Sequence, residues 1–362
     1  MYKFAAVLLV LMTGLVAHSP AQSKSSPIAN LPCATTGPYV QTDGTNLTSN
    51  GAVLKLRGYT FYPATTGGTS AWHSTNFQAY EDNILSVGLS GGQNLIRPTD
   101  FWNKSTPNQN AFDPTVWANM DHLVCKAASE GVYVIMDLSA YKWLLVSQGQ
   151  DPSVATNWKN FLDVIAHHYS QAPNIAFYSL VGEPAYPQSA AEDATLTAFY
   201  KYVTDEVAGQ DKNHLISAGG FNNMNNGYPG WWKSIYNLAH NNVALFKTYS
   251  QHDIDLMPTI LNYTHSITKP AIDEEFGMPQ SLGDGSYSGQ AYNGITTSRA
   301  QFYQTVYTNG ENLATAGFVF WNLADLSGST HYDVYPGTTP AVWQVIQQHG
   351  TAPVSTPKPC GA

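Results

Sequence analysis

The sequence predicts a single-domain (β/α)8 TIM barrel, and three observations support this fold class. Short apolar runs alternate with helical patterns along most of the chain, which is typical of a parallel sheet with crossover helices. The alternation gives eight strand-then-helix units, enough to close the sheet into a barrel. The length of 362 residues suits one such barrel. A doubly wound open sheet is the alternative, but the G-x-G-x-x-G turn that usually accompanies it is absent.

The predicted strands and helices follow each other in strict order. The strands are Ala52–Phe61, Asn94–Arg97, Val132–Leu138, Ile175–Val181, Leu215–Ala218, Val243–Tyr249, Ala271–Glu275 and Gly317–Trp321. The helices are Thr75–Val87, Asp113–Glu130, Asp151–Tyr169, Ala190–Ala208, Gly230–His240, Ile254–Ile267, Thr297–Tyr307 and Pro340–His349. The clearest helix signals are a capping aspartate before proline at Asp113 and a glycine stop at Gly131.

The regions outside the barrel have their own composition. Residues 1–21 read as a signal peptide, with Lys3 before an apolar stretch and small residues near Ala21. A membrane anchor is the alternative, although the apolar stretch is short for a span. Residues 22–50 form a polar lead-in that can include a hairpin closing the barrel floor, residues 51–350 form the catalytic barrel, and residues 351–362 form a Pro-rich tail. We therefore expect a protein that is secreted, extracellular or periplasmic.

The charge and composition limit the partners. Charged residues make up only 11% of the chain and the net charge is −9, which argues against nucleic acid because that partner needs a basic footprint. The surface is instead rich in amides, hydroxyls and aromatic rings, which suit a neutral, hydroxyl-rich ligand. We expect a monomer with no membrane partner after signal cleavage, and no metal site, since no Cys/His cluster has zinc-ligand spacing.

The three cysteines allow at most one intramolecular disulfide. Cys125 lies on the apolar stripe of a predicted helix and is interpreted as a buried free thiol. Cys33 and Cys360 flank the mature domain, whose ends a closed barrel brings together. The sequence therefore predicts a Cys33–Cys360 disulfide.

Chemically active residues stand at the ends of the predicted strands, where barrel enzymes carry their active sites. These residues are Arg97, Asp137, Glu183, Tyr249, Glu275 and Trp321. Two glutamates facing each other across a barrel mouth are what glycosidic cleavage needs: one protonates the leaving oxygen, and the other attacks the anomeric carbon or activates water. Arg97 can hold the anionic partner, whereas Asp137 is interpreted as structural. The alternative is that both glutamates are surface carboxylates.

The same positions resemble glycoside hydrolase family 5, in its cellulase and mannanase branch. The resemblance extends from Leu56-Arg-Gly-Tyr-Thr-Phe61 to Phe318-Val-Phe-Trp321. It is carried by Asn94-Leu-Ile-Arg97, Glu183-Pro184, Tyr249 and Glu275-Phe-Gly277. It implies that Glu183 is the acid/base and Glu275 the nucleophile. It also implies that Arg97 and Tyr249 contact the nucleophile, and that Trp321 forms the floor of the subsite for the attacked sugar.

Three positions depart from that pattern. Gly182 replaces the fourth-strand asparagine, Ser139 the third-strand histidine and Lys247 the sixth-strand histidine. These changes indicate a divergent subfamily, a related family or a different sugar, and Ser139 and Lys247 are expected beside the substrate. Strand alternation also predicts that Glu274 and Glu275 point to opposite sides of their strand, so that only Glu275 faces the mouth.

Other aromatic and amide residues are weaker candidates for sugar binding. Trp102, Trp143 and Trp232 can stack on sugar faces or simply pack, and Trp72 and Trp231 also fall in or beside predicted loops. Asn222, Asn223, Asn225 and Asn226 form either a turn cluster, the favoured interpretation, or part of a sugar subsite.

The leading hypothesis is a secreted retaining β-glycosidase that hydrolyses a β-linked polysaccharide, a β-glucan or β-mannan, without a cofactor. One alternative is a carbohydrate-binding barrel with little or no catalysis. Another is a transglycosylase that uses Glu183 and Glu275 on a sugar acceptor instead of water.

Overall fold

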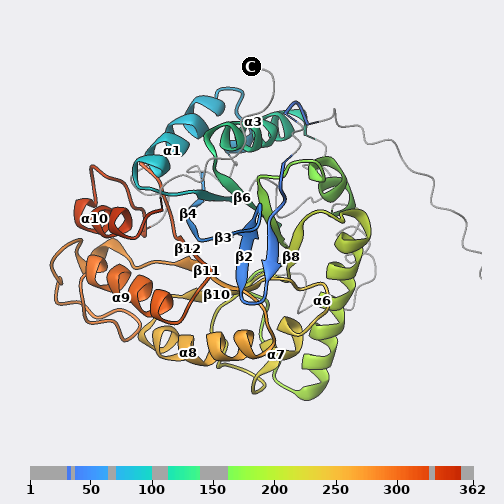
Figure 1. The fold of residues 1–362 in the computed structure, drawn as a ribbon. Helices are drawn as coiled ribbons and strands as arrows, with labels where there is room; N and C mark the ends of the chain where they lie inside the picture. Colours follow the sequence, from blue (N-terminus) through green and yellow to red (C-terminus); the bar gives the residue numbers. More distant parts are fainter. Residues whose placement is uncertain are drawn as a thin grey trace, which may run out of the picture.

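The computed structural model describes residues 31–33, 37–63, 71–99, 113–138, 162–325 and 331–351, and these form an α/β barrel (Figure 1). Within that part of the chain nine parallel strands form one sheet, in the order β8-β7-β6-β5-β4-β12-β11-β10-β9. Their bounds are β4 Leu56–Phe61, β5 Leu95–Pro98, β6 Tyr133–Asp137, β7 Ile175–Ser179, β8 Leu215–Ser217, β9 Gly220–Phe221, β10 Ala244–Thr248, β11 Ala271–Phe276 and β12 Gly317–Phe320.

The sheet closes through an interrupted strand. β8 and β9 are two pieces of the fifth strand of the barrel, separated only by Ala218 and Gly219. β8 pairs with β7 and β9 pairs with β10, so this one segment joins both edges of the sheet. Gly219 has φ +133°, and a Cβ there would lie 2.2 Å from the Val181 carbonyl oxygen, so glycine is needed at the interruption. The predicted (β/α)8 barrel is confirmed.

The helices surround the sheet (Figure 1). They are α1 Gln78–Ser90, α3 Pro114–Glu130, α6 Ala190–Gln210, α7 Trp231–Tyr236, α8 Gln251–Ser266, α9 Arg299–Asn312 and α10 Pro340–Gln348, with short 3-10 turns η1 Ala71–His73 and η3 Gln280–Leu282. Residues 162–169 are helical, and the predicted start of that helix at Asp151 lies outside the described residues. Asp113 caps α3 through the amides of Thr115 and Val116, as predicted. No helix of the described chain is long and apolar enough to cross a membrane.

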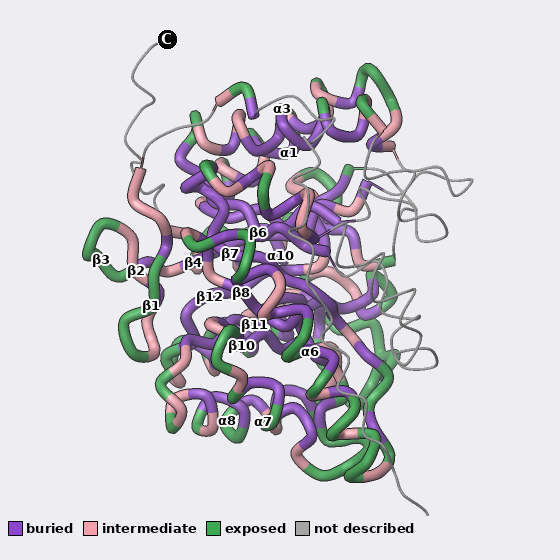
Figure 2. The backbone as a smooth tube through the Cα atoms, turned by 90° about the vertical axis from the view of Figure 1, so that its right-hand side faces the viewer, coloured by how far each residue is buried: buried purple, intermediate pink, exposed green. Residues whose placement is uncertain are grey.

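A small antiparallel sheet covers one end of the barrel (Figure 2). It consists of β1 Gln41–Asp43, β2 Asn46–Ser49 and β3 Ala52–Leu54, so the predicted strand Ala52–Phe61 is two strands divided at Lys55. Leu47 and Leu54 pack with the apolar residues inside the barrel. A larger apolar layer fills the space between the strands and the helices. The lead-in therefore contains the hairpin that the sequence analysis allowed.

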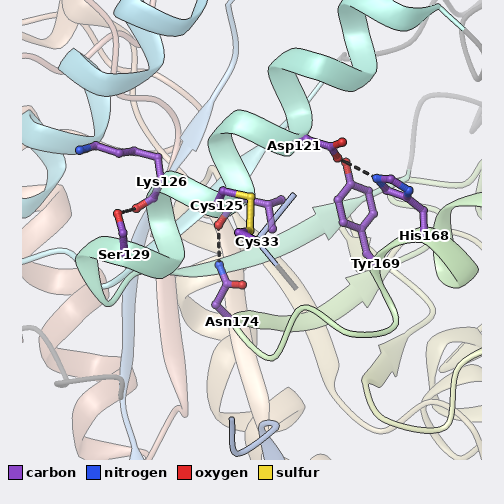
Figure 3. The surroundings of a disulfide bond; sticks show 9 residues. Cys33, Asp121, Cys125, Lys126, Ser129, His168, Tyr169 and Asn174 are labelled. Carbon is purple, nitrogen blue, oxygen red and sulfur yellow. Dashed lines mark hydrogen bonds and ion pairs between the residues drawn. A yellow bond between two sulfur atoms is a disulfide. The ribbon is translucent and has the colours of Figure 1, made fainter. Parts of the chain in front are cut away.

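The disulfide differs from the predicted one. Cys33 is bonded to Cys125, not to Cys360, which lies outside the described residues together with the rest of 352–362 (Figure 3). The prediction was wrong because Cys125 was assigned to the core, whereas its face of α3 is only partly buried and meets the segment carrying Cys33. The bond ties the lead-in to α3, beside the point where Asn174 donates to the Val124 carbonyl oxygen.

We expect Cys33→Ser and Cys125→Ser to destabilise the protein equally. The closed loop spans 92 positions, for which the chain-entropy model gives an upper limit of about 4–5 kcal/mol. Urea unfolding measures the change, with Cys360→Ser as the control that keeps wild-type stability. Peptide mapping under non-reducing conditions checks the pairing directly, and a Cys33–Cys360 peptide would contradict the structure.

A second stability prediction concerns Glu81 on α1, which is fully buried. Neither carboxyl oxygen has a hydrogen-bond partner within the described chain. Burial, with the charge of Asp82 as a smaller cause, raises the pKa of Glu81 from its ordinary 4.5 to about 9. The folded protein therefore keeps a proton that the unfolded chain releases, and the free energy of unfolding falls as pH rises from 4.5 to about 9.

We expect Glu81→Gln to stabilise the protein by roughly 2–4 kcal/mol at pH 8 and by less than about 1 kcal/mol at pH 4. Urea unfolding at both pH values measures the difference. Glu130→Gln, on the exposed end of α3, should change stability little at either pH. An equal effect of Glu81→Gln at both pH values would show that Glu81 is ionised in the folded protein.

Candidate active site

Six charged side chains gather at the carboxyl ends of the strands. Arg97 comes from β5, Asp137 from β6, Lys247 from β10, Glu274 and Glu275 from β11, and Glu183 from the segment after β7. A cleft of 490 Å³ opens above them, and Glu183, Tyr249, Glu275 and Trp321 are among the residues that line it. The structure therefore brings together the two glutamates, the arginine, the tyrosine and the tryptophan that the sequence analysis selected.

Glu183 is positioned by an unusual backbone conformation. It has φ +49°, the left-handed region that residues other than glycine seldom adopt. Its amide donates to the Gly220 carbonyl oxygen at 2.8 Å, which ties it to the interrupted strand. Its side chain keeps 20% exposure on the cleft. Strained backbone of this kind gathers at functional sites, where the surrounding structure holds it in place.

Glu275 is held by three donors. The Tyr249 hydroxyl donates to Oε1 at 2.6 Å, while Arg97 Nη1 and Lys247 Nζ donate to Oε2 at 2.6 Å and 2.8 Å. Burial alone would raise the pKa of Glu275, but the charges of Lys247 and Arg97 outweigh it and the pKa is lowered. Glu275 is therefore ionised over the range in which proteins usually work.

Lys247 joins the two carboxylates that line the cleft. Its Nζ lies 3.1 Å from Glu183 Oε1 and 2.8 Å from Glu275 Oε2. Since both oxygens bind one nitrogen, they lie at most about 6 Å apart, an upper limit that is near the separation of about 5–5.5 Å in retaining glycosidases and below the inverting range. Lys247 itself is not among the residues that line the cleft.

The prediction that Glu274 and Glu275 point to opposite sides of their strand was wrong. On β10, Phe246 pairs with Asp273 and the next residue, Lys247, pairs with Glu275, so Glu274 is an extra residue in the ladder. The pairing with β12 shifts at the same place. This β-bulge interrupts the alternation of side chains. Both glutamates consequently reach the charged cluster, Glu275 at the cleft and Glu274 fully buried.

Glu274 occupies space that a glycine leaves open. Its Oε1 accepts from the Ser179 hydroxyl at 2.5 Å and lies 3.6 Å from Arg97 Nε. A Cβ on Gly220 would lie 1.9 Å from its Oε2, so no larger residue fits there without displacing Glu274. Burial raises the pKa of Glu274, although Arg97 opposes this effect.

Arg97 contacts three carboxylates. It forms ion pairs with Asp137, Glu274 and Glu275 and donates to the Thr60 hydroxyl. Asp137 is buried beside it, which fits the structural role expected from the sequence. The planar guanidinium can serve several carboxylates at fixed angles, which an ammonium cannot do.

The walls of the cleft are aromatic and amide-rich. The Trp321 ring lies 5.2 Å from that of Tyr62, and the Tyr332 ring meets Tyr249 edge-on at 5.9 Å. The remaining lining residues are Asn222, Asn223, Ser250, Asp253, Tyr292 and Asn293. The sequence analysis favoured a turn for the asparagine cluster, but the first two members line the cleft. Tyr292, Asn293 and Tyr332 were missed because they come from long loops in which no sequence pattern points inward.

Some predicted residues are elsewhere. Trp232, like Trp72 and Trp231, is buried in the apolar layer, so a stacking role for these three is excluded. They were misplaced because Trp231 and Trp232 begin α7 and Trp72 lies in η1, and all three side chains are buried. Ser139, Trp102 and Trp143 lie outside the described residues. The described residues include no cluster of His, Cys, Asp and Glu that could hold a metal ion.

Comparisons with known proteins agree with this geometry. The family model described as "Cellulase (glycosyl hydrolase family 5)" matches residues 52–314. No curated protein sequence matches the chain. Among solved structures, the chain is similar to the endo-1,4-β-mannanase of Rhizomucor miehei, with TM-score 0.66, 17% identity and coverage of 86% of this chain and 98% of that one.

Two further structures show the same fold. An endo-β-1,4-mannanase from Thermotoga petrophila gives TM-score 0.65 at 15% identity, with coverage of 83% of this chain and 77% of that one. A β-glucanase from Saccharophagus degradans gives TM-score 0.59 at 15% identity, with coverage of 88% and 96%. The match of the family model over most of the chain, on a barrel with paired glutamates at its mouth, shows that this protein belongs to glycosyl hydrolase family 5.

Proposed function

We propose that this glycoside hydrolase is a secreted, retaining β-glycosidase that cleaves O-glycosidic bonds in a neutral β-linked polysaccharide, a β-mannan or β-glucan. One observation carries the retaining mechanism. The oxygens of Glu183 and Glu275 that bind the Lys247 nitrogen are at most about 6 Å apart, which is close to the separation of about 5–5.5 Å in retaining enzymes and below the roughly 6.5–9.5 Å of inverting enzymes.

The environments of the two glutamates support different roles. Glu275 accepts from Tyr249, Arg97 and Lys247 and carries a lowered pKa, which suits a nucleophile. Glu183 pairs with Lys247 and is more exposed on the cleft than Glu275, which suits a group that exchanges protons with the leaving oxygen and with water. In the proposed reaction Glu275 attacks the anomeric carbon while Glu183 protonates the leaving oxygen, and Glu183 then activates the water that releases the sugar.

The lining of the cleft supports a neutral sugar. Tyr332, Tyr292 and Trp321 supply ring faces, and Asn222 and Asn223 supply amide donors and acceptors. Apart from Glu183 and Glu275, the one charged residue among the described lining residues is Asp253. Asp253 already accepts from Ser250 and from the Tyr249 amide. A mannan is the first substrate to test, since mannanases are among the similar structures.

Secretion is part of the proposal. The N-terminal 21 residues have the pattern of a signal peptide. The Cys33–Cys125 disulfide also favours an oxidising compartment, because disulfides are rare in cytosolic proteins.

The experiment is a screen of soluble mannans, glucans and xylans, with proton NMR of the first-formed anomer on any substrate that is cleaved. We expect the β-anomer to appear first, because two displacements at the anomeric carbon retain its configuration. Early appearance of the α-anomer would refute Glu275 as nucleophile. Sugar transfer to an acceptor in place of hydrolysis would identify a transglycosylase. Binding without any product would identify a carbohydrate-binding barrel.

Replacing the nucleophile separates catalysis from binding. We expect Glu275→Gln to lower kcat by at least about 10³-fold while substrate binding, measured by calorimetry, changes little. Glu130→Gln, on the surface of α3, is the control and should be fully active. Near-normal turnover by Glu275→Gln would require another nucleophile.

Tyr249 tests the hydrogen bond to the nucleophile. Removing its hydroxyl deletes the 2.6 Å bond to Glu275 Oε1, and a hydrogen bond to a charged group contributes about 1.5–3 kcal/mol. We therefore expect Tyr249→Phe to lower kcat by about 10–100-fold. Tyr263→Phe, which loses only a hydrogen bond at the surface, should leave kcat unchanged. A fall in affinity with unchanged kcat would show that Tyr249 binds substrate rather than Glu275.

A further inference from the structure

Lys247 lies beneath the cleft and touches both proposed catalytic carboxylates. Its side chain is 4% exposed, and it rises from β10 between β9 and β11. Its Nζ donates to Glu183 Oε1 at 3.1 Å and to Glu275 Oε2 at 2.8 Å. The family pattern that this sequence resembles has a histidine at this position. A histidine loses its charge near neutral pH, whereas a lysine keeps its charge.

The charges around Glu183 come from several elements. Lys247 contacts it from β10, Glu275 from β11 shares that lysine, and the Tyr249 hydroxyl follows β10. Arg97 on β5 is occupied by Asp137, Glu274 and Glu275. Glu275 has two further donors of its own, and Lys247 also forms an ion pair with Glu183. Lys247 therefore acts on both carboxylates: it is the largest charge that lowers the pKa of Glu275, and it places an ammonium 3.1 Å from Glu183.

We propose that Lys247 is a positioning residue that holds Glu183 ionised in the free enzyme, so that a proton must be taken up from solvent before a bond to an ordinary sugar leaving group can break. This inference rests on the roles of Glu183 and Glu275 proposed above and adds the control of their protonation. Lys247 acts through the two carboxylates and is not among the residues that line the cleft in which the sugar would bind.

The two chemical steps respond to Lys247 in opposite ways. In the first step a bond forms from Glu275 to the anomeric carbon, the glycosidic C–O bond breaks, and the proton of Glu183 goes to the leaving oxygen. This step needs protonated Glu183, which the ammonium disfavours. In the second step Glu183 takes a proton from water while the oxygen of that water replaces Glu275. Glu275 is an uncharged ester until then, so Lys247 pairs with Glu183 alone and favours the base.

The consequence is a dependence on pH and on leaving group. With a sugar leaving group, kcat/KM should be highest in acid and fall as Glu183 loses its proton. With 2,4-dinitrophenolate, which leaves without protonation, kcat/KM should stay level over the same range. This difference between the two profiles identifies Glu183 as the acid, and a shift of the alkaline limb when the cation is removed identifies the role of Lys247.

The test compares pH profiles of kcat/KM for an oligosaccharide and for the 2,4-dinitrophenyl glycoside of the same sugar. We expect Lys247→Met to move the alkaline limb of the oligosaccharide profile upward by about 1–2 pH units and to leave the dinitrophenyl profile level in that alkaline range. Because Lys247 also lowers the pKa of Glu275, the acidic limb of both profiles should move upward together. Lys247→Arg keeps a cation and should keep the alkaline limb near its wild-type position. Lys201→Met removes one exposed charge on α6 and is the matched control. An unmoved alkaline limb in Lys247→Met overturns the proposal.

A second measurement does not depend on activity. Carbon-13 NMR of glutamate-labelled protein, with Glu183→Gln to assign the signal, follows the charge of Glu183 directly. We expect Glu183 to stay ionised to lower pH in wild type than in Lys247→Met. Identical titrations overturn the role of Lys247. A clear difference in titration, in a protein that cleaves no glycoside, leaves that role in place and refutes the proposed function instead.

Discussion

The active-site end of the barrel depends on the balance between two buried cations and four carboxylates. Arg97 and Lys247 are almost fully buried, and the acids around them are Asp137, Glu183, Glu274 and Glu275. Burying an unpaired charge costs free energy, so each buried cation or carboxylate is stabilised by the opposite charges around it. The four carboxylates outnumber the two cations, and burial raises the pKa of Glu274, which disfavours its charged form. The remaining excess lies at the cleft, where Glu183 meets solvent.

The cluster explains why the strand ends have their local irregularities. The bulge at Glu274 turns an additional carboxylate inward, and Gly220 makes room for it. Gly219 allows the close approach of the Val181 backbone, and Glu183 adopts a left-handed conformation beside Lys247. Each of these irregularities interrupts regular strand pairing or strains the backbone. Together they help to bring charged groups from the ends of β5, β6, β7, β10 and β11 into contact. The regular part of the barrel supplies the apolar packing that holds these irregularities in place.

Much of this could be predicted from the sequence. The apolar runs and the cap at Asp113 are local signals, and they led to the barrel and to the strand ends that carry Arg97, Glu183, Tyr249 and Glu275. The bulge at Glu274 was not predictable. The sequence shows only that successive side chains should alternate between the two faces of a strand, whereas a bulge is defined by how the strand pairs with its neighbour. Likewise, the Cys33–Cys125 bond depends on where the lead-in crosses α3, and the buried tryptophans depend on how their turns fold. Contacts between residues that are far apart in the chain produce no periodic pattern in the sequence.

The close approach of Glu274 to Gly220 has a consequence for how this protein can change over evolution. The glutamate fills the volume that a side chain at position 220 would need, so the two positions cannot vary independently. A relative with alanine or serine at the position of Gly220 should carry a shorter residue than glutamate at the position of Glu274. It would then also lose one of the anions that Arg97 contacts. Members of the family that have both Gly220 and Glu274 at these positions would share this arrangement of charges.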